Sequence, residues 1–156
     1  MKRLLPLALL LAACAPKPVV EPVYRDTSRQ VYSIAGFAPG RIAGHWNQVA
    51  GFGTACSGGS MEIGAQTTYA LCLPSGIKSG AGPMQAAVPG RFDLPGVGPF
   101  WVLWVDGDNR TMVVGQPAGH FGMILNRDAH LPPDRLKAAR DILEFNGYDV
   151  KNLRVY

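Results

Sequence analysis

The residue types that most often carry catalysis are present in this chain, but they are scattered. His45, His120 and His130 have no second ligand at metal-binding spacing, whereas a zinc site needs three or four ligands in tetrahedral geometry. Asp106 and Asp108 could act as an acid–base pair, yet they stand in a segment where Asp is favoured for turn formation. Neither group assembles a catalytic set, so the sequence predicts a protein that is not an enzyme and uses no metal or cofactor.

The start of the chain has the pattern of a secretory signal. Lys2 and Arg3 precede an apolar stretch, residues 4–13, which is about half the ~20 residues that a membrane span needs. Small residues then stand directly before Cys14, as they do at a signal cleavage site. The run Leu-Ala-Ala-Cys is similar to a bacterial lipobox, in which the cysteine takes lipid and becomes the mature N-terminus. We therefore expect a signal peptide over 1–13 and lipidation of Cys14; the alternative is an ordinary signal peptide with an incidental cysteine.

Residues 14–35 are rich in proline and predict a tether. Pro16, Pro18 and Pro22 prevent a helix and favour an extended chain. We expect this tether to join the lipid to one folded domain, residues 36–156. By resemblance to such lipoproteins, Ala15 after the cysteine suggests sorting to the outer membrane, on its periplasmic side.

The charge of the chain does not indicate a nucleic-acid partner. The formal net charge of +4 includes Lys2 and Arg3 of the leader, so the mature chain carries a net charge of +2. No basic run with interleaved aromatic residues occurs.

Two cysteines remain once Cys14 is set aside. An even remainder in an oxidising compartment predicts a Cys56–Cys72 disulfide. The loop it would close, about 15 residues, is worth on the order of 3 kcal/mol in the chain-entropy model. The alternative is a pair of free buried thiols.

The middle of the chain favours short strands and tight turns, because it is dense in glycine and proline between short apolar runs. Residues 100–105 and 111–114 flank a Gly/Asp/Asn turn and predict a hairpin. Further candidate strands are residues 44–53, 60–66, 68–73, 84–88, 91–94 and 120–125.

Past Leu131 the apolar period changes and predicts a helix over 132–146. Pro132 and Pro133 suit a helix start, and Gly147 suits the position just past its end. One face carries Leu136, Ala139, Ile142 and Leu143. The fold class is therefore all-β with one C-terminal helix lying outside an antiparallel sheet, which manages its edges best by closing into a barrel.

Three segments carry a resemblance to the lipocalins, most of all to the bacterial outer-membrane lipocalins related to apolipoprotein D. Gly44-His45-Trp46 matches the family's Gly-x-Trp at the start of the first strand, and Ile124-Leu125-Asn126-Arg127 resembles the end of the eighth. Residues 102–115 resemble the sixth and seventh strands, although the family usually has an aromatic residue where this chain has Asn109. Residues 131–156 resemble the C-terminal helix and last strand, whereas the 47 residues between Phe52 and Phe100 do not align.

The resemblance implies an up-and-down barrel of eight short strands; a reduced six-stranded or open barrel is the alternative. It also implies that Arg127 lies across Trp46 and closes one end of the barrel. For these two residues and the loop after Asp106 to converge, the first strand must start, and the sixth and eighth must end, at that same end.

The function that the resemblance implies is binding of a small hydrophobic ligand, such as a fatty acid (palmitate) or a lysophospholipid, by a membrane-anchored protein of the bacterial envelope. The candidate lining residues are Ala50, Met84, Trp101, Phe121 and Met123. Trp101 and Trp104 stand an odd number apart, so strict alternation predicts that they face opposite sides of their strand.

The competing hypothesis is a structural or protease-inhibitor-like periplasmic lipoprotein without ligand, with residues 15–29 as an exposed segment. An apolar interior cavity of roughly 300 Å³ or more favours ligand binding, and a filled core favours the alternative.

Overall fold

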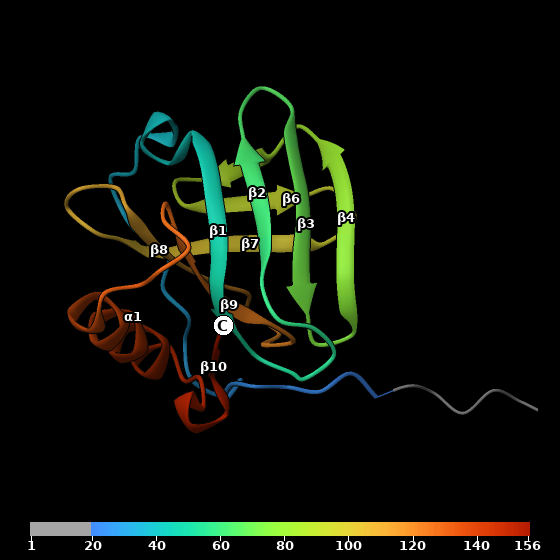
Figure 1. Ribbon diagram of the computed structural model, residues 1–156, viewed down its shortest axis with the longest axis vertical. Helices are drawn as coiled ribbons and strands as arrows, with labels where there is room; N and C mark the ends of the chain where they lie inside the picture. Colours follow the sequence, from blue (N-terminus) through green and yellow to red (C-terminus); the bar gives the residue numbers. More distant parts are fainter. Residues whose placement is uncertain (1–19) are drawn as a thin grey trace, which may run out of the picture.

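The computed structural model describes residues 20–156, and its main feature is one strongly curled antiparallel sheet with a helix against its outer face (Figure 1). A 3-10 turn, η1 (Pro39–Ile42), leads into the first strand. The strands are β1 (Gly44–Gly51), β2 (Gly59–Ile63), β3 (Thr67–Leu73), β4 (Gly76–Gly82), β5 (Gln85–Val88), β6 (Arg91–Leu94), β7 (Gly98–Val105), β8 (Thr111–Gly115), β9 (Gly122–Asn126) and β10 (Arg154–Val155). The helix α1 (Pro133–Phe145) and a second 3-10 turn, η2 (Val150–Asn152), precede β10.

The sheet is an unbroken antiparallel path with the order β4-β3-β2-β1-β9-β8-β7-β6-β5, and β10 pairs with the end of β1. Its two outermost strands, β4 and β5, are consecutive in the chain and are separated by Pro83 and Met84. Because neighbouring strands along the path are antiparallel, β4 and β5 run in the same direction. The short segment between β4 and β5 connects the two edges of the sheet covalently. In Figure 1, β6 and β7 cross behind β1 to β4.

The expected count of eight strands is wrong, and so is the six-stranded alternative. Nine strands lie on the path, and within residues 20–156 no ladder joins β4 to β5, so the open-barrel alternative describes the wall best. The sequence prediction missed β4, because Gly-Ile-Lys-Ser-Gly-Ala-Gly has little β propensity of its own. Its pairing with β3 over the whole length of both strands compensates for that. The predicted direction of the strands is confirmed: β1 starts, and β7 and β9 end, at one end of the barrel.

Two β-bulges decide which side chains face the interior. In β7 the pairing with β8 shifts between Val102 and Trp104, and in β1 the pairing with β9 shifts between Gln48 and Ala50. A bulge places two residues opposite one and resets the in–out alternation. The prediction that the two tryptophans face opposite sides is therefore wrong: Trp101 and Trp104 both pack against the outer apolar cluster.

The interior of the barrel is filled by apolar side chains, and a second apolar layer lies between the sheet and the helix. In the helix, the predicted apolar face is confirmed, since Ala139 and Leu143 are buried and Leu136 and Ile142 pack beside them. The interior cluster comprises Phe37, Ile42, Trp46, Met61, Ile63, Tyr69, Leu71, Phe92, Leu94, Phe100, Val102, Val105, Met112, Val114, Phe121, Met123 and Leu125.

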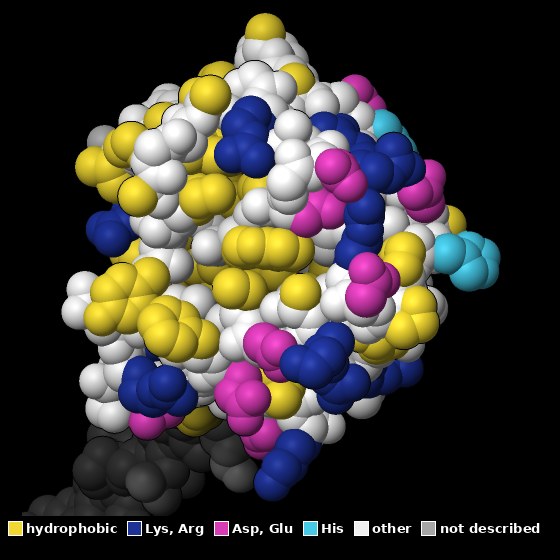
Figure 2. Space-filling view, turned by 90° about the vertical axis from the view of Figure 1, so that its left-hand side faces the viewer, with side chains coloured by type: hydrophobic (Ala, Val, Ile, Leu, Met, Phe, Trp, Pro, Cys, Tyr) yellow, Lys and Arg dark blue, Asp and Glu magenta, His cyan; other side chains and the backbone are white. Residues whose placement is uncertain are grey.

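On its outside, the face that carries α1 shows apolar side chains between groups of opposite charge (Figure 2). The rings of Tyr32 and Phe145, both exposed, lie 5.8 Å apart there.

The N-terminal segment is part of the folded domain from about Tyr24 onward. The backbone N–H of Tyr24 donates to Gly119, the N–H of Asp149 donates back to Tyr24, and Arg25 is buried and pairs with Tyr148 in an isolated bridge. From Tyr24 onward the expected tether thus packs on the barrel, and the domain extends well before residue 36. Cys14 and residues 1–13 lie outside the described residues.

Two arginines of this segment cap the C-terminal end of α1, whose own last turn has no basic residue. Arg25 donates from Nε to the carbonyl of Asn146 (3.1 Å), from Nη1 to Pro117 (2.6 Å), and from Nη2 to Arg29. Arg29 donates to the carbonyls of Glu144 (3.2 Å) and Phe145 (3.0 Å). Cations at this end satisfy carbonyls that lack helical partners and interact favourably with the helix dipole.

The predicted disulfide is confirmed. Cys56 and Cys72 are joined, with their Cα atoms 5.7 Å apart, so the loop between β1 and β2 is fixed to β3. None of the helices within residues 20–156 combines the length and the apolar character needed to cross a membrane.

We expect Arg25→Ala to lower the free energy of unfolding by about 2–4 kcal/mol, because three backbone carbonyls in a buried region lose a charged donor. Urea unfolding of the variant measures this loss. Lys137→Ala is the matched control, since its exposed ammonium pairs with Asp141 (2.7 Å) on the helix surface; it should leave the free energy of unfolding nearly unchanged, because exposed ion pairs contribute little to stability. Equal effects of the two changes would contradict the capping role.

Candidate ligand-binding site

One end of the barrel is closed by a stacked pair. Trp46 is fully buried, and the guanidinium carbon of Arg127 lies 3.7 Å from the centre of its ring. The indole Nε1 donates to Ile42 in η1 (2.7 Å), while Arg127 donates to the carbonyls of His45 (2.8 Å) and Asn109 (3.2 Å). The predicted contact is therefore present, and it joins η1, the start of β1 and the loop after β7.

The loop after β7 supports this closure through Asn109. This residue adopts φ 56° and accepts a hydrogen bond at its side-chain Oδ1 from Arg41 Nε (2.7 Å). Asp106 accepts from the backbone N–H groups of Arg110 (2.7 Å) and Thr111 (2.9 Å), which is the turn role expected from the sequence. Within residues 20–156, no cluster of His, Cys, Asp and Glu is arranged to hold a metal ion.

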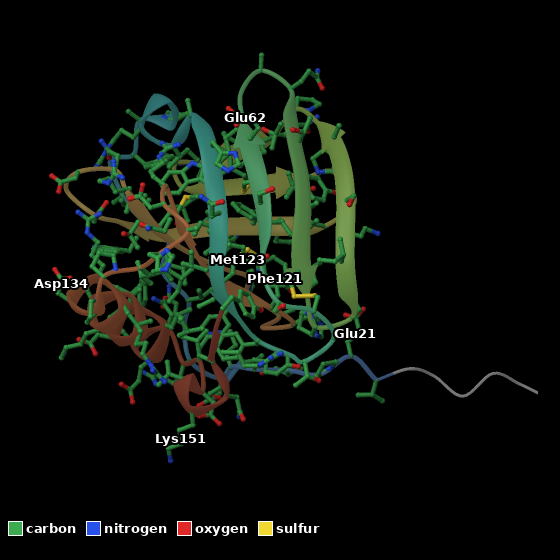
Figure 3. All side chains as sticks on the ribbon, viewed as in Figure 1. Glu21, Glu62, Phe121, Met123, Asp134 and Lys151 are labelled. Carbon is green, nitrogen blue, oxygen red and sulfur yellow. A yellow bond between two sulfur atoms is a disulfide. The ribbon has the colours of Figure 1, made fainter. Side chains whose placement is uncertain are left out.

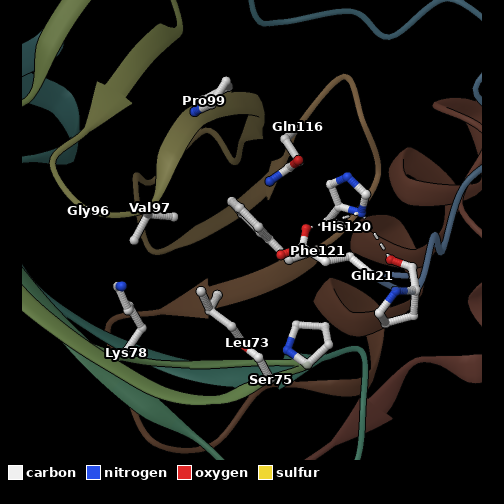
Figure 4. Close-up of a pocket in the computed structure, with 12 residues that line it drawn as sticks. Glu21, Leu73, Ser75, Lys78, Gly96, Val97, Pro99, Gln116, His120 and Phe121 are labelled. Carbon is white, nitrogen blue, oxygen red and sulfur yellow. Dashed lines mark hydrogen bonds and ion pairs between the residues drawn. The ribbon is translucent and has the colours of Figure 1, made fainter. Parts of the chain in front are cut away.

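At the opposite end the barrel opens into a pocket of about 280 Å³ (Figure 4). The ring of Phe121 lies in the middle of the pocket, with Leu73 on one side and Gln116 on the other (Figure 4). The lining residues are Glu21, Pro22, Leu73, Pro74, Ser75, Lys78, Gly96, Val97, Pro99, Gln116, His120 and Phe121.

The pocket combines apolar walls with a polar rim. Leu73, Val97 and Phe121 give it apolar surface, whereas Lys78 brings a cation that forms no ion pair with any carboxylate in the described part of the chain. On the other side of the rim, His120 Nδ1 lies 3.1 Å from the carbonyl oxygen of Pro22 and 3.7 Å from Glu21 Oε2. This arrangement suits a molecule that has an apolar body and an anionic or polar head.

Tyr148 holds the backbone that presents Phe121 and Gln116 to the pocket. Its hydroxyl donates to the carbonyl of Phe121 (2.9 Å) and accepts from the N–H of Gln116 (2.9 Å). Burial raises the pKa of Tyr148 to about 12. Its ring lies against the paired Gly115 and Gly122, and a Cβ at Gly122 would stand 2.7 Å from Tyr148 Cε1, which is closer than a side chain tolerates.

The structure separates the five candidate lining residues. Phe121 lines the pocket, Met123 lies deeper in the filled interior, and Met84 is half-buried against the same interior cluster. Two assignments are corrected: Ala50 and Trp101 belong to the outer layer, and Arg91 lies 4.0 Å above the Trp101 ring. The bulges in β1 and β7 are the physical reason for both errors.

Most of the rim escaped the sequence prediction. Leu73, Lys78 and Val97 lie in the region that could not be aligned, and Glu21 was assigned to the tether. The sequence held only an indirect signal for these rim residues. Because Trp46 and Arg127 mark the closed end of the barrel, the mouth must lie where β1 ends and β9 begins.

Comparison with known proteins identifies the class of this fold. Residues 85–156 match the family model of the lipocalin-like domain. Over 60 residues the chain is 32% identical to temperature-induced lipocalin-1 of Arabidopsis thaliana, a stretch that covers 38% of this chain and 32% of that protein. The chain thus spans about a third of the length of the curated relative it matches.

Solved structures show the same architecture over most of the chain. The siderocalin Ex-FABP, described as functioning through dual ligand specificities, superposes with a TM-score of 0.52 at 17% identity, covering 74% of this chain and 93% of that one. Lobster apocrustacyanin A1 superposes with a TM-score of 0.51 at 14% identity, covering 74% and 77%. The described chain therefore has a lipocalin-like fold.

The Trp46–Arg127 pair should stabilise the barrel as a unit. We expect Trp46→Ala to cost about 3–5 kcal/mol and Arg127→Ala to cost less. In a double-mutant cycle the pair should show a coupling of about 1 kcal/mol or more, because the two side chains touch. Urea unfolding of the four proteins gives the coupling. Trp46→Ala combined with Lys137→Ala is the additive control, and zero coupling for the stacked pair would remove the argument.

Tyr148 should make the fold sensitive to alkali. The folded-state pKa of about 12 exceeds the ordinary value of 10.0, so the folded protein keeps this proton longer than the unfolded chain does. This difference in pKa contributes about 2–3 kcal/mol to the free energy of unfolding. The contribution is fully present below pH 10 and is lost as the pH rises from 10 to 12. Tyr148→Phe should be less stable at neutral pH but should lose less stability across that window. Urea unfolding from pH 8 to 11.5 measures both, with the exposed Tyr32→Phe as control; parallel pH profiles for Tyr148→Phe and the parent would refute this.

Proposed function

We propose that this chain is a lipocalin-type protein of the bacterial envelope that binds a small hydrophobic ligand in the pocket at the barrel mouth and is not an enzyme. The observation that carries the proposal is the pocket itself, about 280 Å³ with Phe121 at its centre. The lipocalin-like fold supports it, because similar folds occur in the siderocalin Ex-FABP, a protein described by its ligand specificities.

The ligand class that suits the rim is an amphiphile with an anionic head, such as a fatty acid or a lysophospholipid. Its carboxylate or phosphate would meet Lys78, and its first methylene groups would lie against Leu73, Val97 and Phe121. Each buried methylene contributes about 0.8 kcal/mol, whereas micromolar binding needs about 8 kcal/mol in excess of the association costs. A long acyl chain such as palmitate therefore has to displace side chains of the filled interior, among them Met123, which follows Phe121 on the interior side of β9.

The anchoring part of the proposal comes from the sequence alone. The lipobox-like run before Cys14 supports attachment to a membrane, and Ala15 supports the periplasmic side of the outer membrane. The bacterial origin rests on the same run, since the curated relative is a plant protein.

The second candidate is a structural barrel lipoprotein without ligand, and the filled interior favours it. An inhibitor-like role for residues 15–29 has less support, because Arg25 is buried and residues 24–29 are bound to the barrel and to the end of α1. A segment held in this way is not free to enter a protease cleft.

Titration of the Cys14→Ala chain with a fluorescent fatty acid tests the proposal. We expect saturable binding that Val97→Trp abolishes by filling the pocket, and that Lys78→Ala weakens about three- to tenfold for the acid but not for the matching alcohol. Val88→Trp is the matched control, because Val88 is exposed away from the pocket.

Two results would contradict ligand binding at the mouth. One is the absence of saturation up to about 100 μM, because a binding free energy below about 5.5 kcal/mol is too weak for a specific ligand. That result would favour the structural lipoprotein. The other is equal binding by the Val97→Trp and Val88→Trp variants, which would move the ligand elsewhere.

A further inference from the structure

The chain leaves the described domain at the rim of the pocket. Glu21 and Pro22 line the pocket, and the hydrogen bond between Tyr24 and Gly119 and the burial of Arg25 fix the following residues to the barrel. The segment runs along the mouth end (Figure 1), where Glu21 lies, while Glu62 marks the opposite end (Figure 3). Val20 is therefore held beside the mouth.

The reach of the chain limits how the domain stands on a membrane. Only five residues lie between Cys14 and Val20, so the two Cα atoms are six steps apart, and an extended chain of ~3.3–3.6 Å per step spans about 20 Å in all. The eight residues of β1 alone, seven steps of ~3.3 Å, span about 23 Å from the first Cα atom to the last, and η1 lies beyond its closed end. If Cys14 holds a lipid in a bilayer, the closed end cannot reach that bilayer, whereas the mouth end can.

The surface around the mouth has the composition of a membrane-facing surface. Within residues 20–156, seven large apolar side chains are exposed, and four of them lie on the N-terminal segment or on strand ends at the mouth. These are Val20 (87% exposed), Val23 (52%), Ile77 (57%) and Val155 (48%).

Basic side chains accompany these apolar residues. Lys78, Lys151 and Arg154 are exposed near the same end, and the exposed acidic residues of the same segments are Glu21, Asp26 and Asp149. Lys151 lies at the tip of this end (Figure 3). Exposed apolar groups flanked by lysine and arginine fit the interface of a bilayer that contains anionic lipids.

We propose that the mouth end of the barrel docks on the phospholipid surface that carries the anchor, so that the pocket opens toward the lipid. This inference rests on the proposed anchoring at Cys14. An apolar ligand then passes between bilayer and pocket without crossing bulk water. Phospholipid is the occupant of this surface, and the closed end with Trp46 and Arg127 points away from the membrane.

The experiment compares the depth of two fluorescent probes on the full lipidated chain. An environment-sensitive fluorophore is attached to a cysteine at one of two sites. One variant, Asn152→Cys, places it at the mouth end. The other, Gly107→Cys, places it in the turn after β7 at the closed end, where an added Cβ meets no neighbouring atom. Each protein is reconstituted into phosphatidylethanolamine–phosphatidylglycerol vesicles that carry head-group nitroxide lipids. Without reductant the Cys56–Cys72 disulfide stays closed, and a lipidated Cys14 has no free thiol.

We expect nitroxide quenching to be several-fold stronger at residue 152 than at residue 107. Lys151→Glu should reduce quenching at residue 152, whereas Lys137→Glu, an equal charge change on the exposed side of α1, should leave it unchanged. Equal quenching at both sites on chains that do carry lipid overturns the docking and leaves the proposed anchoring intact. Mass spectrometry that finds no lipid on Cys14 overturns both, while binding of the fluorescent fatty acid, which is measured without membranes, is unaffected.

Discussion

The burial of Trp46 beneath Arg127 is the contact around which the barrel is arranged. A fully buried indole needs a partner for its N–H, and Ile42 supplies it; a guanidinium over the ring needs carbonyl acceptors, and His45 and Asn109 supply those. These partners come from η1, β1 and the loop after β7, so the three must meet at one point. With that end closed and the interior filled, the room that remains for a ligand lies at the other end.

At the mouth of the barrel, the N-terminal segment and the C-terminal helix stabilise each other. Arg25 and Arg29 satisfy the last carbonyls of α1, so the helix ends correctly only when the N-terminal segment is in place. Immediately past the helix, Tyr148 pairs with Arg25 in a bridge and fixes the backbone of Phe121. The pocket wall, the helix end and the exit of the chain toward Cys14 are thus parts of one hydrogen-bonded assembly, which explains why the segment behaves as part of the domain although its composition is typical of a linker.

The local parts of this fold could be predicted from the sequence, and the long-range ones could not. The helix at Pro133–Phe145 has its own periodicity and end signals, and the hairpin around Asp106 has its own turn residues. A bulge, in contrast, is set by the curvature that the whole sheet must adopt, so strict alternation wrongly placed Trp101 and Trp104 on opposite sides of β7. The bulge in β1 likewise turns Ala50, a candidate lining residue, into the outer layer. The strand β4 was missed for a related reason, because its pairing with β3 stabilises it rather than its own residues. In the site, Phe121 was foreseen and the rim residues of the unaligned region were not.

The packing beneath the pocket decides how deep a ligand can go. Phe121, Met123 and Leu125 face the interior at alternate positions, so they form a column from the pocket toward Trp46 at the closed end. Phe121 is held through its backbone by Tyr148, whereas Met123 is unbranched and adapts its shape more readily than any other residue of that column. For the ligand class proposed above, deeper entry of an acyl chain requires movement of Met123, whereas the backbone at Phe121 is held by Tyr148. Such entry stops at Trp46, because moving that side chain would open the closed end of the barrel.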